Sequence, residues 1–276
     1  RRYYYQYYGK HDAEHPRAQI ERLKGLTTVP MAIGTLTHEV IAAILARLLK
    51  SVQPLDRARL AAYVQRSVHE ALAHFEFDEV YYQLLAEVGR DAILPRVSDH
   101  VAAFVSGERF KWILQRAVHH VDSWMIEPPG YGETRIDGQK AYCKVDFACF
   151  ADGRYWVFDW KTGREDEARH QEQLAVYAAW VAEHYGVPPE QVTPVVAYFQ
   201  PTYSERRIEV SAAELGRLSA KVHEEVAAMH AFCRDPANNL PLPKAEFALT
   251  DDLRCCRRCG FRELCGRAAA PAAQVG

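Results

Sequence analysis

The order of strands and helices between residues 141 and 199 constrains the fold of this chain more than any other feature. Apolar and polar residues alternate from Ala141 to Phe150, and Asp152–Gly153 is a typical turn of a β-hairpin. Tyr155 to Lys161 is the return strand, a helix with an acidic first turn follows it, and Val195 to Phe199 predicts a further strand. This order predicts an α/β or α+β fold.

Helices predominate on either side of this segment. An apolar face that begins near Gly34 is typical of an amphipathic helix. The stretch from Leu55 to Val121 fits three more amphipathic helices and forms a large helical insertion. Ser211 and Glu214 form a capping box that opens another helix, which ends near Cys233.

Composition excludes several classes of protein. Hydrophobic residues make up 49% of the 276 residues and charged residues 25%, which excludes a collagenous, coiled-coil or wholly disordered chain. No apolar run approaches the ~20 residues of a membrane span, and no basic–apolar leader is present, so we expect a cytoplasmic protein with no membrane partner. Arg1 in place of Met indicates that the natural start lies upstream. The net charge of -2 neither implies nor excludes binding to nucleic acid.

Two aspartates and a lysine are expected on one face of the predicted hairpin. Asp159 and Lys161 are two residues apart in a strand and therefore point to the same face. Asp146 is expected on the polar face of the strand that pairs with it. Carboxylate oxygens in such a patch suit Mg²⁺ or Mn²⁺, and the lysine can stabilise developing charge on a substrate phosphate. A surface salt bridge is the alternative, but strand 155–161 is too apolar for an ordinary exposed strand.

Further side chains could belong to the same site. Gln173 and Tyr177 stand one helical turn apart, where the amide could orient a water or a phosphate and the phenol could donate its hydroxyl. Packing of Tyr177 against the sheet is the alternative. His38 follows Gly34 by four positions, and a histidine on an apolar helix face is either a hydrogen-bonded core residue or a ligand. Glu127, which precedes the sheet, is an additional candidate carboxylate.

These motifs occur in an order that resembles a known family of nucleases. The sequence contains, one after another, Gly34-x-x-x-His38, Val145-Asp146, Asp159-Trp160-Lys161 and Gln173-x-x-x-Tyr177. In this order and at these intervals they resemble the RecB-type branch of the PD-(D/E)XK nuclease superfamily. Each motif alone is weak, but the four together extend over about residues 1 to 210. The resemblance implies a restriction-endonuclease-like core, in which helices flank a mixed central sheet, and metal-dependent cleavage of DNA phosphodiesters.

The resemblance also implies roles for single residues. The implied metal ligands are His38, Asp146, Asp159 and the backbone carbonyl of Trp160. Lys161 would be the catalytic lysine, and Gln173 and Tyr177 would line the site. The implied cofactor is Mg²⁺ or Mn²⁺, and the implied substrate is DNA, either single-stranded or with free ends.

Four of the cysteines fall close together near the end of the sequence. Cys256, Cys259 and Cys265 supply three thiolates at short spacing, and a fourth would complete a zinc site or an iron–sulfur cluster. Cys255 is the remaining thiol of this segment, although adjacent residues rarely reach one metal site comfortably. Unligated cysteines in a reducing compartment are the alternative.

A resemblance at both ends of the chain favours the iron–sulfur cluster over Zn²⁺. RecB-type nucleases with such a cluster, including CRISPR-adaptation exonucleases and AddB-type helicase–nuclease subunits, have three C-terminal cysteines at this spacing and a fourth before an Arg- and Tyr-rich stretch. Residues 1–5 are similar to that stretch, but no cysteine precedes Cys143. The implied ligands of a structural [4Fe–4S] cluster are Cys256, Cys259 and Cys265. Either Cys255 or a residue upstream of Arg1 is the fourth ligand, or the cluster is incomplete. The implied partner is a helicase or a CRISPR-adaptation integrase.

We therefore expect a single nuclease domain over residues 1–276. Its expected parts are an N-terminal segment with the first core helix (1–54), a helical insertion (55–122), the catalytic sheet and helices (123–235), a metal-cluster segment (244–267) and a disordered tail (268–276). Two alternatives stay open. One is a catalytically silent DNA-binding or assembly subunit with the same fold, and the other is a zinc-stabilised interaction protein.

Overall fold

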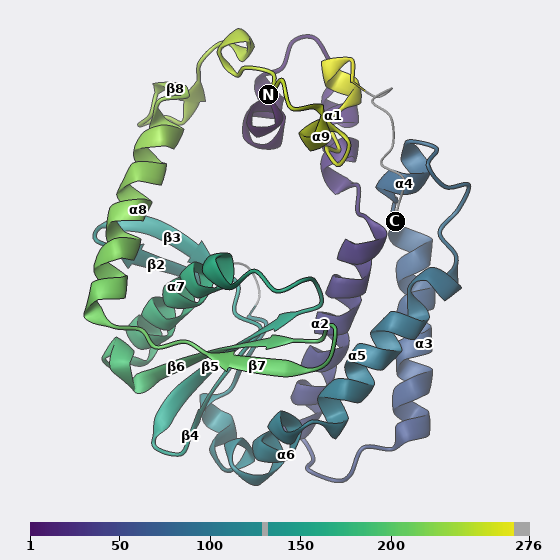
Figure 1. Ribbon diagram of the computed structural model, residues 1–276, viewed down its shortest axis with the longest axis vertical. Coiled ribbons are helices and arrows are strands. Elements are labelled where there is room, and N and C mark those ends of the chain that lie inside the picture. Colours follow the sequence, from purple (N-terminus) through teal and green to yellow (C-terminus); the bar gives the residue numbers. More distant parts are fainter. Residues whose placement is uncertain (129–131, 268–276) are drawn as a thin grey trace. The chain divides into compact units, whose positions relative to one another are not determined.

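The computed structural model describes residues 1–128 and 132–267 of the chain (Figure 1). The chain forms two compact units. The terminal unit comprises Arg1–Val29, Leu72–Gly89 and Glu225–Gly276, and the sheet unit comprises Pro30–Ala71 and Arg90–Glu224. The expectation of one nuclease domain over the whole chain stays a prediction. The expected disordered tail, residues 268–276, lies outside the described residues.

A five-stranded sheet is the core of the sheet unit (Figure 1). Its strands are, in spatial order, β1 (Met125–Ile126), β4 (Phe147–Ala151), β5 (Arg154–Lys161), β6 (Val192–Tyr198) and β7 (Ser204–Arg207). β5 and β6 are parallel, and the other neighbours are antiparallel. Parallel strands need a crossover connection, and α7 (Glu167–Tyr185) is the helix of that crossover. The predicted α/β architecture with a mixed central sheet is therefore confirmed.

Local sequence signals set the ends of these elements. Asp152 and Gly153 have positive φ angles of 52° and 77°, as a two-residue hairpin turn between β4 and β5 requires. Asp166 caps α7, because its carboxylate accepts a hydrogen bond from the Arg169 amide. Gly186 ends the same helix in the left-handed conformation. The predicted hairpin and the helix that follows it are confirmed.

The alternating segment from 141 to 150 is not one strand. It is divided between β3 (Gln139–Cys143), which pairs with β2 (Gly132–Ile136), and β4. Asp146 lies in the break before β4 and not on the polar face of a strand, so this part of the prediction is wrong. The physical reason is that Asp146 bonds to other segments: its carbonyl accepts from the Glu127 amide at 3.0 Å, and its buried carboxylate accepts from the backbone of β5 at 2.7 Å.

Helices cover both faces of the sheet. On one face, a buried apolar cluster joins α7 to the central strands. On the other face lie α5 (Leu94–Ser106) and α6 (Glu108–Gln115), whose aromatic rings contact those of β5. The ring centroids of Phe104 and Trp160, for example, lie 5.3 Å apart. The sheet unit is therefore built in three layers, which is how an α/β core removes both sheet faces from water.

The helix expected near Gly34 is α2 (Val29–Leu48). Among the described residues it is the one helix long and apolar enough to cross a membrane, and 44% of that stretch is buried inside the protein. A core helix passes the same test of length and composition, so one such helix is weak evidence for a membrane span. The buried side chains between Ala32 and Leu48 identify α2 as part of the core of the sheet unit.

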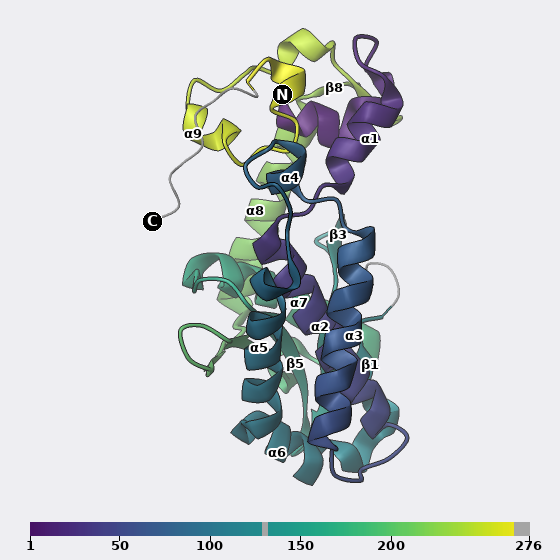
Figure 2. The same cartoon turned by 90° about the vertical axis from the view of Figure 1, so that its right-hand side faces the viewer.

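The stretch from 55 to 121 is helical, as predicted, but it contains more than three elements. The longer helices are α3 (Arg57–His74), α5 and α6. Shorter helical turns are α4 (Asp78–Tyr81), Arg90–Ala92 and Ala117–Ser123. Figure 2 shows α2 and α3 as neighbouring helices that a loop connects.

The terminal unit combines both ends of the chain with α4. Its elements include the helical turns Tyr4–Tyr8 and Gly9–His11, α1 (Arg17–Gly25), the end of α8 (Ala212–His230), β8 (Cys233–Asp235), β9 (Leu240–Pro241) and α9 (Leu253–Cys256). One apolar cluster contains Tyr4, Tyr5, Tyr8, Ile20, Leu23, Phe247, Phe261 and Leu264. Three of the N-terminal tyrosines are therefore core residues of this unit.

A buried ion pair joins α4 to the cysteine segment within the terminal unit. Arg262 Nη1 and Nη2 each lie 2.9 Å from an oxygen of Asp78. The side chains are only 3% and 10% exposed, respectively. The Arg262 guanidinium also lies 3.3 Å from the centre of the Tyr82 ring. This bidentate ion pair, together with the stacking of the guanidinium on the Tyr82 ring, holds the cysteine segment in a defined orientation against α4.

Candidate active site

Helix α2 approaches the end of β5 closely enough to bring a histidine beside an aspartate. A Cβ atom at Gly34 would lie 3.2 Å from Thr162 Oγ1, so the absence of a side chain at Gly34 permits this approach. One helical turn later, His38 Nδ1 lies 3.1 Å from Asp146 Oδ1. The first two predicted motifs therefore meet in the sheet unit.

Asp146 is held in a fixed orientation by its neighbours. Its Oδ2 accepts a hydrogen bond from the Trp160 amide at 2.7 Å, while Oδ1 faces His38. The side chain is 7% exposed, so the carboxylate is largely screened from bulk water. Trp160 thus contributes its N–H to the site, and the ligand role implied for its carbonyl stays a prediction.

Glu127 completes a group of three possible metal ligands. Its φ angle of 33° is uncommon for a residue with a side chain, and such strained backbone is concentrated at functional sites. One ligand atom from each of His38, Glu127 and Asp146 lies within 4.8 Å of the others, the one such group found among the described residues. This spacing suits nitrogen and oxygen ligands on opposite sides of one divalent cation.

Asp159, Lys161 and Gln173 form a second cluster of direct contacts. Lys161 Nζ lies 2.7 Å from Asp159 Oδ2 and donates to Gln173 Oε1 at 2.8 Å. The Gln173 amide nitrogen donates to Asp159 Oδ1 at 3.3 Å and to the Tyr177 hydroxyl at 2.7 Å. β5 supplies the aspartate and the lysine, and α7 supplies the glutamine and the tyrosine. The sheet and the crossover helix therefore orient the lysine ammonium together.

Negative charge is concentrated where the two clusters meet. Burial lowers the pKa of His38, but Asp146 and the other nearby carboxylates outweigh it and raise that pKa to about 9. Burial and the charge of Asp146 raise the pKa of Asp159, and the nearby Lys161 and His38 oppose this increase in part. Buried carboxylates in this number attract positive charge, and the site therefore fits a divalent cation.

The structure brings seven predicted site residues together in the sheet unit. They are His38, Asp146, Asp159, Trp160, Lys161, Gln173 and Tyr177. In the described part of the chain, however, the three-ligand group contains Glu127 where the family resemblance placed Asp159. Asp159 contacts the lysine and the glutamine instead. The individual catalytic roles stay predictions.

A buried histidine that contacts α2 was not among the predicted site residues. His100 Nδ1 lies 3.2 Å from Thr37 Oγ1, and its Nε2 lies 3.4 Å from the amide nitrogen of Gln200. Burial lowers the pKa of His100 to about 4, so the ring is neutral at physiological pH. The Gln200 amide then donates to Nε2, and Nδ1–H donates to Thr37. This contact supports α2 one residue before His38, and nothing in the local sequence indicates it because its partners are distant along the chain.

Glu127→Gln should weaken the binding of Mn²⁺ by about tenfold or more, because the amide keeps the size of the side chain but removes its charge. Isothermal titration calorimetry with Mn²⁺ measures this change. Glu133→Gln is a matched control, since Glu133 is exposed on the β2–β3 hairpin and pairs there with Lys140. Equal Mn²⁺ affinities of the Glu127 variant and the parent chain would exclude Glu127 from the metal site.

The four cysteines near the end of the chain lie in the terminal unit. Cys256 is buried, Cys259 and Cys265 are half-buried, and Cys255 is exposed. Burial and the nearby Cys259 raise the pKa of Cys265, and the amino group of Arg1 opposes the increase in part. Three thiols therefore interact electrostatically, but within residues 1–128 and 132–267 no three thiols lie within 4.8 Å of one another. The iron–sulfur cluster stays a prediction.

The sequence matches one family model over nearly its whole length. The model describes the PD-(D/E)XK nuclease superfamily and matches residues 1–266. The chain is also similar to the crystal structure of the protein SSO0001, with 15% identity and a TM-score of 0.30 over 78% of this chain and 99% of that one. A candidate exonuclease from Eubacterium rectale has 16% identity and a TM-score of 0.38 over 81% of this chain and 79% of that one. No curated protein gives a significant match.

Proposed function

This chain belongs to the PD-(D/E)XK nuclease superfamily, and from that premise we propose that it is a Mg²⁺- or Mn²⁺-dependent deoxyribonuclease. We further propose that it acts like an exonuclease, on DNA that is single-stranded or has free ends. The observation that carries the proposal is the meeting of the three-ligand group His38, Glu127 and Asp146 with the Asp159–Lys161 pair. Metal-dependent hydrolysis of a phosphodiester uses ligands that hold a divalent cation and a nearby positive charge that stabilises the phosphate, and this site contains both.

The residues of the site divide the work of hydrolysis between them. His38, Glu127 and Asp146 would hold the cation, with Asp159 as a further carboxylate beside it. When bound, Mg²⁺ or Mn²⁺ polarises the phosphate and makes a coordinated water more acidic. Lys161 then stabilises the negative charge that develops on the phosphate oxygens. Gln173 holds the lysine in place through its carbonyl oxygen, and its amide nitrogen links it to Tyr177.

We also propose that Cys256, Cys259 and Cys265 hold a structural [4Fe–4S] cluster. The electrostatic interaction among these thiols supports the proposal, and so does their place next to the first residues of the chain. Zn²⁺ is the competing metal for the same thiolates. Visible absorbance and the iron and zinc content of the purified protein distinguish the two. The family resemblance further supports a helicase or a CRISPR-adaptation integrase as the partner, which co-purification with either protein tests.

Lys161→Met should reduce Mn²⁺-dependent cleavage by about 10²- to 10³-fold, because it removes the ammonium group that contacts Asp159 while keeping an unbranched side chain. The assay is cleavage of end-labelled single-stranded and double-stranded DNA. Lys140→Met is the matched control, since this lysine is exposed and pairs with Glu133 on the hairpin. Undiminished cleavage by the Lys161 variant contradicts the proposal. Binding of DNA by the parent chain without any cleavage favours the catalytically silent subunit.

A further inference from the structure

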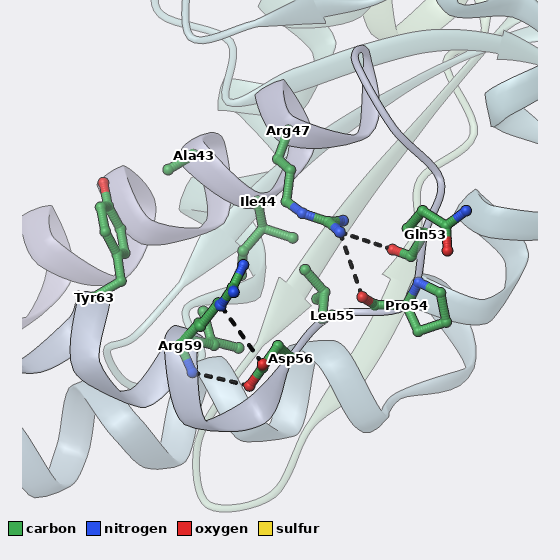
Figure 3. Close-up of a pocket in the computed structure, with 10 residues that line it drawn as sticks. Ala43, Ile44, Arg47, Gln53, Pro54, Leu55, Asp56, Arg59 and Tyr63 are labelled. Atoms are coloured by element: carbon green, nitrogen blue, oxygen red, sulfur yellow. Dashed lines mark hydrogen bonds and ion pairs between the residues drawn. The ribbon is translucent and has the colours of Figure 1, made fainter.

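A pocket in the sheet unit lies where α2 turns into α3, and the proposed catalysis does not use it. Its volume is about 490 Å³ (Figure 3). The residues that line it include Ile44, Arg47, Leu55, Arg59, Leu60 and Tyr63. Four of these side chains are apolar or aromatic, and the two arginines lie among them. The pocket therefore combines a hydrophobic interior with positive charge.

Hydrogen bonds hold the walls of this pocket in place. The Arg47 guanidinium donates to the carbonyl oxygens of Gln53 and Pro54, at 2.9 and 3.3 Å (Figure 3). It also donates to the carbonyl oxygen of Ser51 at 3.4 Å. Asp56 accepts from the Arg59 amide at 3.1 Å and so caps the start of α3. The loop between the two helices is thus tied to both of them. A ligand would enter a formed pocket and would not have to order the loop first.

Charge around the pocket is strongly positive. Residues 43–68 carry a net charge of +4, because they contain one acidic residue, Asp56, and five basic residues, Arg47, Lys50, Arg57, Arg59 and Arg66. The whole chain, in contrast, has a net charge of -2. The Arg59 side chain is 90% exposed, and its contact with Asp56 is a long one, at 3.7 Å. Lys50, Arg57 and Arg66 are exposed as well, so most of this charge is available to a polyanion.

An aromatic ring lies within the same charged surface. Tyr63 lines the pocket one helical turn after Arg59, and the guanidinium of Arg66 lies 5.6 Å from the centre of the Tyr63 ring. Arg59, Tyr63 and Arg66 thus share one face of α3. Arginines alternating with an aromatic ring are the arrangement that binds single strands, because the ring stacks on a base and the cations neutralise phosphates.

We propose that this pocket binds an unpaired base of single-stranded DNA, with Arg59 and its basic neighbours on the flanking phosphates. The proposal rests on the proposed function, because it assumes that DNA is the substrate. It adds a second contact with the strand, outside the site of cleavage. A duplex with no unpaired bases cannot use it.

The position of the pocket on α2 predicts which substrates gain from it. Arg47 follows His38 by nine residues, which corresponds to about 14 Å along the helix axis and two and a half turns around it. The pocket therefore lies on the side of α2 away from His38. A short substrate at the cleavage site cannot reach it, whereas a long strand that passes around the helix can. The pocket should accordingly affect the KM of long strands and leave the hydrolysis of a dinucleotide unchanged.

Tyr63→Ala should weaken the binding of a long single-stranded oligonucleotide by about tenfold, which is the effect of losing one stacked base. Fluorescence anisotropy without divalent metal measures this Kd while no cleavage takes place. Tyr63→Phe keeps the ring and should bind like the parent chain. Arg59→Gln should reduce the slope of log Kd against log salt by about 0.7, as expected for one phosphate contact on a single strand. Lys111→Gln, an exposed lysine on α6, is the control for loss of charge elsewhere.

An oligonucleotide without bases tests the base itself. The parent chain and Tyr63→Ala should bind an abasic strand of the same length equally well. Equal affinities of these two chains for the normal strand, or equal losses on normal and abasic strands, would overturn the proposal. The two proposals also fail separately. If DNA is bound but never cleaved, the proposed nuclease activity is wrong, and if DNA is cleaved while Tyr63→Ala keeps the parent Kd and KM, only the pocket is wrong.

Discussion

Asp146→Asn is expected to reduce DNA cleavage by about 10⁴-fold or more while the chain stays folded. Asp146 is the residue on which the first cluster of the site converges, since it contacts His38 and belongs to the three-ligand group. The substitution removes the negative charge that a cation needs there. The asparagine oxygen can still accept the hydrogen bond from the Trp160 amide, so the local backbone keeps its partner.

The experiment compares cleavage of end-labelled DNA in Mn²⁺ by the parent chain, Asp146→Asn and a control. Asp122→Asn is a suitable control because Asp122 is exposed and the substitution removes the same negative charge. Circular dichroism and thermal unfolding show whether each variant is folded. A folded Asp146→Asn chain that cleaves within tenfold of the parent rate contradicts the placement of the metal site.

Asp78→Ala is expected to destabilise the protein by about 3–5 kcal/mol, which is the usual cost of removing one partner of a buried ion pair. The loss leaves the guanidinium of Arg262 inside the terminal unit without its carboxylate, at a position where only 3% of that side chain reaches water. The stacking of Arg262 on Tyr82 remains but cannot replace a charge. The cysteine segment should therefore be held less firmly against α4.

Urea unfolding of the full chain measures this change, and a double variant tests its cause. Arg262→Met combined with Asp78→Ala leaves no unpaired charge, so it should be more stable than Asp78→Ala alone. Glu108→Ala, which breaks an exposed pair with Lys111, is the control and should cost less than about 1 kcal/mol. If the double variant is as unstable as the sum of the two single ones, the ion pair is not the source of the effect.

The parts of the fold that depend on short-range signals could be predicted from the sequence. Asp152–Gly153 sets the β4–β5 hairpin through its own backbone preferences, and Asp166 and Gly186 set the two ends of α7. The break before β4 could not be predicted in this way. It depends on the contact between Asp146 and Glu127, and alternating polarity contains no information about such a partner.

In the candidate site, too, contacts between residues close in sequence could be predicted, and contacts between distant residues could not be predicted from local patterns. The spacing of Asp159 and Lys161 places both on one face of β5, and their ion pair in the structure agrees with it. The meeting of His38 with Asp146 joins residues 108 positions apart, which only the ordered set of motifs indicated. Glu127 was recognised as a candidate carboxylate, but its place in the three-ligand group could not be predicted, because it depends on residues that are distant along the chain.

The absence of a side chain at Gly34 determines how closely helix α2 approaches the end of β5 in the candidate site. Helix α2 contains His38, and Thr162 directly follows Lys161 in the sequence. A Cβ atom added at position 34 would lie 3.2 Å from Thr162 Oγ1, which is tighter than most contacts of this kind, so the threonine side chain or the helix would have to shift by a few tenths of an ångström. A residue without any chemical function of its own thus helps to set the separation of His38 from Lys161, on which the proposed reaction depends.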